Sequence, residues 1–191
     1  MDVFVSAAAL VALAPIFGIL SLIVKLDSPG PVFHRRLVLK RGGGTCGAFK
    51  FRTMIEHDEC FWQQHPDLWQ EYQKNFKLSK DPRVTRVGRL LRITSLDELP
   101  QLLNVLKGEM SLVGPRMITP LELGKYGASA AKLLTVKAGI TGLWQISGRQ
   151  HLSYPERVAL DMHYIDRRSL ILDIKIVTRT VLVVLRRTGA Y

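Results

Sequence analysis

The sequence predicts an α+β fold that is mainly helical, with an N-terminal membrane helix and a compact domain of short strands and amphipathic helices. Residues 3–24 carry no charged side chain and are long enough to enter a bilayer. Glycine-punctuated segments at 41–54 and 136–149 favour strands and turns. Residues 154–191 predict two helices, the second strongly apolar. We therefore expect an anchor at 1–26 and one domain at 27–191.

Three topologies compete for the anchor. A signal peptide is disfavoured, because it begins with basic residues and Asp2 is the only charge ahead of Lys25. A straight transmembrane helix is the ordinary interpretation of such a segment. Pro15 favours a re-entrant helix that enters and leaves on one face, because a proline kinks a helix and each arm then reaches about half the hydrocarbon core. The dense basic residues after the anchor place the domain in the cytoplasm under either membrane topology.

The charge balance predicts anionic partners. The formal net charge is +11 and the sequence pI is about 10, which suits nucleic acid, an acidic membrane surface or phosphorylated small molecules. Nucleic acid is disfavoured, because the apolar anchor would hold the chain at a membrane. Cys46 and Cys60 match neither a zinc site nor a redox pair, so we expect free thiols. The glycines at 42–44 lack phosphate-loop spacing and favour a hairpin turn.

Two segments are amphipathic in a way that leaves their role open. In residues 55–78, Trp62, Trp69 and Phe76 recur every seven residues and so share one helical face, with Pro66 dividing the segment. Such rings suit a membrane interface and core packing equally. The apolar helix expected within 170–187 carries interrupting cations, and it too suits either an interfacial position or the core.

Two adjacent carboxylates, Asp97 and Glu98, follow a basic run and begin the string "DELPQLLNVLKGEMSLVGPR". In a purely structural interpretation they belong to a helix start, either as a capping box with Ser95 as N-cap or with Asp97 as the cap and Pro100 at the third position. The helix would then end at Gly108.

The same position is useful chemically. A helix N-terminus stabilises carboxylate and phosphate alike. An ionised Asp97 there can act as a nucleophile on phosphorus, and Arg92 and Arg116 can bind phosphoryl oxygens. The carboxylate pair can also hold Mg²⁺. The residues alone do not decide between capping and catalysis.

A resemblance favours catalysis. The chain resembles the bacterial sugar transferase family of monotopic polyprenyl-phosphate phosphoglycosyl transferases over nearly its whole length. The strings that carry the resemblance, in order, are "DSPGPVF", "FKFRTM", "DPRVTRVGRLLR", "TSLDELPQLLNVLKGEMSLVGPR", "GITGLWQISGR" and "SLILDIKIV". The segment "HPDLWQEYQKNFKLSKDPRVTRVG" and the closing "GAY" look like the exopolysaccharide branch, whose members often transfer galactose-1-phosphate or glucose-1-phosphate.

The resemblance implies a two-step exchange. Asp97 attacks the sugar-bearing phosphate of a UDP-hexose, UMP leaves, and undecaprenyl phosphate then takes the hexose phosphate. Glu98 assists, and Mg²⁺, for which Asp97 is the expected ligand, neutralises the pyrophosphate. Pro15 matches the position that turns the family's re-entrant helix. The expected substrate-binding residues, all within the quoted strings, are Lys50, Arg52, Arg92, Arg116, Gln145 and Arg149.

The resemblance also implies a place and partners. The protein is expected at the bacterial inner membrane, with its catalytic domain on the cytoplasmic face, against anionic lipids, and a homodimer is among the expected assemblies. The chain departs from the family pattern at Ala14, Met117 and Ala138, none of which alters the carboxylate pair. The alternatives are a membrane glycosyltransferase that moves only the sugar and releases UDP, and a non-catalytic basic protein that binds lipid.

Overall fold

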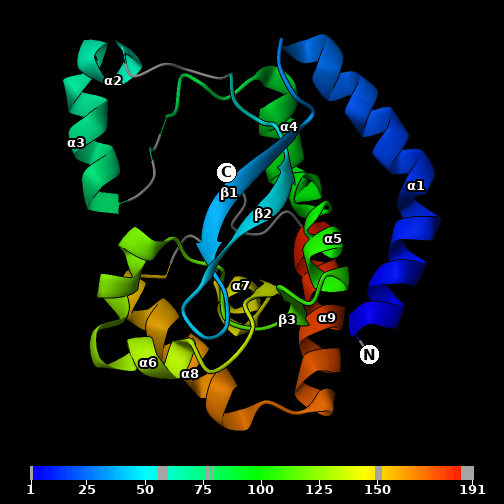
Figure 1. Cartoon of the computed structure of the whole chain (residues 1–191), viewed down its shortest axis with the longest axis vertical. Helices are drawn as coiled ribbons and strands as arrows, with labels where there is room; N and C mark the ends of the chain where they lie inside the picture. The colour runs from blue at the N-terminus through cyan, green and yellow to red at the C-terminus, as the bar shows by residue number, and fades with distance from the viewer. Residues whose placement is uncertain (1, 56–59, 76–77, 79, 149–151, 186–191) are drawn as a thin grey trace.

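The computed structural model of the protein describes residues 2–55, 60–75, 78, 80–148 and 152–185. Figure 1 shows a long helix along one side, a two-stranded ribbon in the middle and the remaining helices around it. The elements in chain order are α1 (Asp2–Asp27), β1 (Phe33–Leu39), β2 (Thr45–Phe51), α2 (Cys60–Gln64), α3 (Pro66–Asn75), α4 (Arg86–Thr94), η1 (Leu96–Glu98), α5 (Gln101–Leu106), β3 (Ser111–Val113), η2 (Pro120–Ser129), α6 (Ala130–Leu133), β4 (Gly139–Thr141), α7 (Leu143–Ser147), α8 (Tyr154–Arg167) and α9 (Leu170–Leu185). The expected mainly helical α+β class is confirmed.

Helix α1 is continuous through Pro15, and Figure 1 shows it bent part-way along its length. In the part of the chain that the structure describes, it is the one helix long and apolar enough to cross a membrane. One side packs inward, where Val24 lies in a cluster with Phe51 and Leu91. Large apolar side chains such as Phe4, which is 83% exposed, cover the other side. The helix is therefore bound to the rest of the chain while still presenting an apolar surface.

Strands β1 and β2 form the antiparallel hairpin that the glycines predicted. Its turn uses left-handed backbone at Gly42 and Gly43, with φ values of 87° and 85°, a conformation that glycine adopts without strain. The antiparallel register runs from Phe33 opposite Phe51 to Leu39 opposite Thr45. Cys46 is buried here as a free thiol, as expected; the side chain of Cys60 lies outside the described part.

Strands β3 and β4 pair in parallel through a very close backbone contact. A Cβ built on Gly139 would lie 2.1 Å from the Gly114 nitrogen, and one on Gly142 would lie 2.1 Å from the Gly114 oxygen. Only glycine fits at such distances, so this contact fixes where the chain leaves β3 toward Arg116.

The expectation of strands and turns throughout 136–149 is wrong after residue 142. Residues Leu143–Ser147 form the short helix α7. Trp144 supplies the physical reason, because the helical turn buries this large side chain to 2% exposure, and burial of one aromatic ring outweighs a weak local strand preference.

The aromatic segment divides as predicted, with α2 and α3 separated by His65. The rings of Trp62 and Trp69 lie 5.0 Å apart, which confirms that they share a face, whereas Phe76 lies outside the described residues. Figure 1 shows α2 and α3 on the side of the molecule opposite α1.

The last two helices are also as predicted. Tyr164 of α8 donates hydrogen bonds to the Val113 oxygen of β3 (3.2 Å) and to Asp173 of α9 (2.8 Å). Ile176 of α9 is fully buried, while neighbours such as Ile171 are 68% exposed. Helix α9 therefore has one face in the core, as one of the two interpretations predicted, and one exposed apolar face; its interfacial position stays a prediction.

Candidate active site

The two carboxylates lie on η1, a single 3₁₀ turn between α4 and α5. Ser95 closes α4 in the left-handed conformation, with φ of 58°, and its side chain does not cap η1. Helix α5 begins only at Gln101, with Pro100 as its N-cap. Both predicted helix starts, the capping box on Ser95 and the cap at Asp97, are therefore wrong. The left-handed residue lets the backbone turn directly from one helix into the next, with Glu98 N–H bonded to the Ser95 oxygen. The predicted end at Gly108 is confirmed by its φ of 73°.

Strand β2 brings a lysine to the pair. The Lys50 Nζ donates to Glu98 Oε1 at 2.5 Å and lies 3.8 Å from Asp97 Oδ2. Asp97 is only 7% exposed, and the Lys50 side chain keeps 17% of its exposure. Three groups that are up to 48 residues apart in the chain thus converge on one point, with a single positive charge between two carboxyl groups.

The environment separates the two carboxyl pKa values. Burial raises the pKa of Asp97 to about 6, and the Glu98 charge adds to this, while Lys50 and Arg92 act in the opposite direction. Burial also acts to raise the pKa of Glu98, but Lys50, by charge and hydrogen bond, together with Arg116 outweighs it and lowers that pKa. Near neutral pH, Asp97 is therefore an ionised and poorly solvated carboxylate, which suits a nucleophile.

Asn104, which no sequence pattern had indicated, positions this lysine. It is fully buried, accepts a hydrogen bond from Phe49 N–H (2.9 Å) and donates to the Gly47 oxygen (2.8 Å). These contacts fasten α5, which follows the carboxylates, to β2, the strand that carries Lys50. An asparagine inside an otherwise apolar helical stripe is the signal that could have identified it.

Arg92 lies on the last turn of α4. Its Nε donates to Thr53 Oγ1 at 2.9 Å, and its charge lowers the pKa of Asp97. Helix α4 can approach so closely because a Cβ on Gly88 would lie 2.1 Å from the Thr53 oxygen. Arg92 is thus close enough to Asp97 for its charge to act on that carboxyl group, and its predicted contact with substrate stays a prediction.

Arg52 occupies a different position. Its Nη2 donates to the carbonyl oxygens of Ser28 (2.5 Å) and Val24 (3.3 Å) at the end of α1, and the residue is 5% exposed. The arginine follows Lys50 by two residues but joins β2 and the residues after it to the end of α1. Its predicted contact with substrate stays a prediction.

Arg116 follows β3 and rests on an aromatic ring. Its guanidinium carbon lies 5.1 Å from the centre of the Trp144 ring, and that of Arg157 lies 5.0 Å from the same centre. The Arg116 charge reaches Glu98, whose pKa it lowers. The structure therefore brings Arg116 toward the carboxylates from a separate part of the fold.

A buried carboxyl group, also missed in the sequence, holds the Arg116 backbone. Asp161 of α8 is 1% exposed, accepts from Arg116 N–H and accepts from the Tyr126 hydroxyl at 2.8 Å. Burial raises the pKa of Asp161 to about 7. Gln145 lies near this region on α7, where its Oε1 is buried and has no hydrogen-bond partner within the described chain. Arg149 lies outside the described residues.

The acidic pair is a reasonable fit for Mg²⁺. Within the described ranges no three His, Cys, Asp or Glu side chains gather as a metal site. However, Asp97 and Glu98 converge on one point now held by the Lys50 Nζ. Mg²⁺ commonly binds one or two carboxylates and completes its octahedron with water and substrate phosphates. A metal bound here would therefore depend on the substrate for most of its ligands.

Comparison with known proteins identifies the family. The bacterial sugar transferase family profile matches residues 1–187. The chain belongs to this family. It is 43% identical to the exopolysaccharide production protein ExoY of Sinorhizobium fredii, over all of this chain and 86% of that protein. It is 41% identical to the UDP-glucose:undecaprenyl-phosphate glucose-1-phosphate transferase of Caulobacter vibrioides, over 98% of this chain and 69% of that protein.

A third relative is longer. The undecaprenyl-phosphate galactose phosphotransferase of Salmonella typhimurium is 43% identical over all of this chain, which corresponds to 40% of that protein. Family membership makes this protein a sugar transferase, and the match extends through both α1 and the convergent Lys50, Asp97 and Glu98.

Proposed function

We propose that this sugar transferase moves a hexose-1-phosphate, galactose or glucose, from a UDP-sugar to undecaprenyl phosphate and releases UMP, as the first membrane step of exopolysaccharide synthesis. The observation that carries the proposal is the convergence of Lys50 on the Asp97–Glu98 pair. The relatives named for transfer of galactose or glucose phosphate to this lipid support the substrates.

The first step forms a covalent intermediate. An Asp97 carboxylate oxygen attacks the phosphorus that bears the sugar, and the bond from that phosphorus to the bridging oxygen breaks. UMP leaves with the electron pair, and a mixed anhydride of Asp97 and the hexose phosphate remains. The raised pKa of Asp97, about 6, supports this role, because the carboxylate is ionised at neutral pH yet weakly solvated.

Nearby cations stabilise the transferred phosphoryl group. Lys50, Arg92 and Arg116 all act electrostatically on the carboxylate pair. When the substrate enters, these cations can shift from the carboxylates to the phosphoryl oxygens, where charge develops in the transition state. Mg²⁺, held by Asp97 and substrate oxygens, would supply further neutralisation of the pyrophosphate.

In the second step a phosphate oxygen of undecaprenyl phosphate attacks the same phosphorus, and the Asp97 carboxylate leaves. The product is the lipid-linked diphosphate sugar. Glu98, which keeps its charge because its pKa is lowered, is suited to orient Lys50 through both steps rather than to donate a proton.

A re-entrant anchor would bring this acceptor to the nucleophile. Asp2 at the start of α1 accepts a hydrogen bond from Ser111 of the domain (2.7 Å), and Ser28 just beyond its end accepts one from Arg52. A helix that crossed the bilayer would separate its ends by about 30 Å of hydrocarbon. A domain on one face could not then contact both ends, which supports entry and exit on the same side.

Two experiments test the function and its topology. The purified protein is incubated with Mg²⁺ and UDP-galactose or UDP-glucose without acceptor, and its intact mass and the free nucleotide are measured. A hexose-phosphate adduct with UMP, absent in Asp97→Asn, is expected. Release of UDP would indicate transfer of the sugar alone, and folded protein that yields neither adduct nor nucleotide would contradict the proposal. A Val3→Cys variant should be labelled from the cytoplasmic side, and labelling from the opposite side would refute the re-entrant helix.

A further inference from the structure

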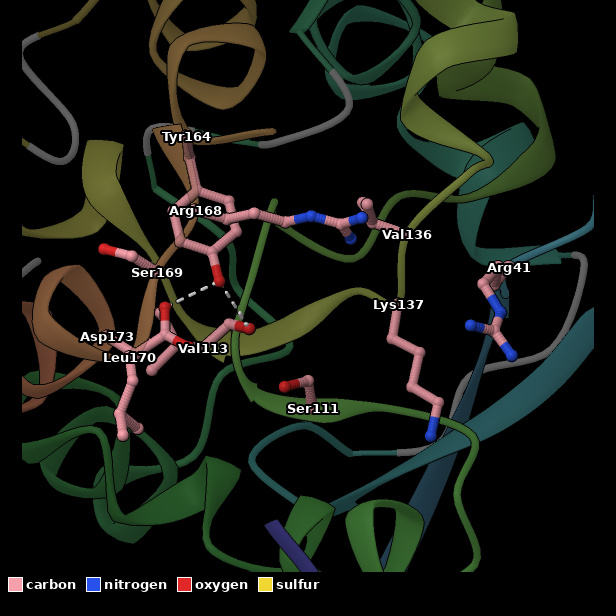
Figure 2. A pocket seen from close by; sticks show the side chains of 10 residues that line it. All are labelled: Arg41, Ser111, Val113, Val136, Lys137, Tyr164, Arg168, Ser169, Leu170 and Asp173. Carbon is pink, nitrogen blue, oxygen red and sulfur yellow. Dashed lines mark hydrogen bonds between the residues drawn. The ribbon is translucent and has the colours of Figure 1, made fainter. Parts of the chain in front are cut away.

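A cavity of about 320 Å³ lies away from the carboxylate pair, between the start of α9, strand β3 and the segment before β4. Figure 2 shows Tyr164, Asp173 and Ser111 on one side of it, and Lys137 and Arg41 on the other, with the Arg168 side chain extending across between them. Asp97, Glu98 and Lys50 do not line this cavity. The chemistry proposed above makes no use of it.

The charges in the cavity favour an anion. Arg41, Lys137 and Arg168 line it, and within the described ranges none of these three side chains has an ion pair or a hydrogen bond. The first turn of α9 also opens into it through Ser169 and Leu170. Unpaired cations beside a helix N-terminus form a site for phosphate or carboxylate.

Two carboxylates border the cavity and are already engaged. The Tyr164 hydroxyl donates to Asp173 Oδ1 at 2.8 Å, and Ser111 donates to Asp2 at 2.7 Å. Burial, reinforced by the Asp2 charge, raises the pKa of Asp173. With three cations against two hydrogen-bonded carboxyl groups, the cavity keeps an excess of positive charge.

Apolar surface adjoins the cavity on two sides. The Asp2–Ser111 hydrogen bond places the start of α1 beside it, and the exposed Phe4 lies two residues further along that helix. Leu170, 58% exposed, lines the cavity itself, and Ile171, 68% exposed, is next to it. Apolar side chains do not stabilise a small soluble anion, whereas a phospholipid has both a phosphate for the cations and acyl chains for the apolar surface.

We propose that this cavity, lined by Arg41, Lys137 and Arg168, binds the phosphate of an anionic phospholipid whose acyl chains lie against the starts of α1 and α9. The site rests on the proposed re-entrant topology, because only then does the start of α1 lie at headgroup level on the side of the domain. Its function is to fix the depth and tilt of the domain, and hence the height of Asp97 above the bilayer.

The test compares two double variants of the full-length protein in neutral detergent. Arg41→Ala with Arg168→Ala removes two cations from the cavity, and Lys125→Ala with Arg167→Ala removes two exposed cations that do not line it. Retention of dioleoylphosphatidylglycerol, dioleoylphosphatidylcholine and inorganic phosphate is titrated by native mass spectrometry. Two cations at an anionic headgroup correspond to roughly thirtyfold in affinity, so phosphatidylglycerol binding should fall by about that factor in the cavity variant and by less than about twofold in the control.

Each other outcome overturns the site. Equal losses in both double variants would mean general electrostatic attraction, and displacement of the lipid by inorganic phosphate at equal concentration would identify a free anion as the ligand. Absence of phosphatidylglycerol from the unmodified protein would also refute it. Lys137→Gln, with a side chain of similar length, should also weaken lipid binding. This single substitution tests the site even if the double variant fails to fold. Asp97→Asn should bind the lipid normally, so that failure of the lipid site and failure of the transferase chemistry give different results.

Discussion

Asp97→Asn is expected to abolish adduct formation and at the same time to stabilise the fold. Asp97 is buried, and burial raises its pKa from the ordinary value of 3.8 to about 6. At about 1.4 kcal/mol for each pKa unit, ionisation of Asp97 costs the folded state about 3 kcal/mol at pH 8. An uncharged asparagine of the same shape removes that cost. A buried carboxylate whose ionisation weakens the fold is consistent with a site selected for reactivity.

The sign of the pH dependence follows from the direction of this shift. Because the folded protein holds the Asp97 proton more tightly than the unfolded chain, the cost is absent below about pH 4, develops between pH 4 and 6, and is complete above pH 6. Denaturant unfolding in detergent should therefore show the variant more stable than the unmodified protein at pH 8, with the difference disappearing toward pH 4.

The matched variant Glu98→Gln should change the stability of the fold in the opposite direction. The pKa of Glu98 is lowered, chiefly by Lys50 acting against burial, so Glu98→Gln removes a favourable ion pair and should destabilise the fold above about pH 5. The reasoning is refuted if Asp97→Asn is no more stable than the unmodified protein at pH 8, or if the difference between them does not change with pH.

Three further predictions concern the same site. The rate of adduct formation, followed by rapid quench and intact mass, should fall as the pH drops through about 6, because attack needs ionised Asp97; a flat profile from pH 5 to 8 would contradict this. Lys50→Met removes the cation that lowers both carboxyl pKa values, so it should move the midpoint of that profile upward, and an unmoved midpoint would show that Lys50 does not control the pair. Asn104→Ala leaves the Phe49 N–H and the Gly47 oxygen unpaired and should cost about 2–4 kcal/mol in unfolding free energy, whereas a loss within the error of an exposed control such as Gln73→Ala would remove its positioning role.

The local features of this fold were predictable because they depend on near neighbours in the chain. The uncharged segment before Lys25, the hairpin at Gly42 and Gly43 and the helix break at Pro66 each follow from backbone and transfer energetics over a few residues. The family resemblance rested likewise on contiguous strings, and the match over residues 1–187 confirmed it.

Other predictions failed where distant contacts outweigh local preference. The capping interpretation of Asp97 was wrong because Ser95 adopts a left-handed conformation that no neighbouring residue requires. Strands were predicted where the burial of Trp144 produces α7. Asn104 and Asp161 were not predicted at all, because their importance lies in groups 45 to 57 residues away.

The sequence by itself determined that an apolar anchor precedes a basic domain and that an adjacent Asp97–Glu98 pair is available for chemistry. Only the tertiary structure decided the pKa of each of those two carboxyl groups. Burial raises the pKa of Asp97, and the contact with Lys50, which lies 47 residues before Asp97 on strand β2, lowers the pKa of Glu98. The physical reason is that a pKa depends on desolvation and on charges within a few ångströms, and these are set by which distant segments the fold brings together.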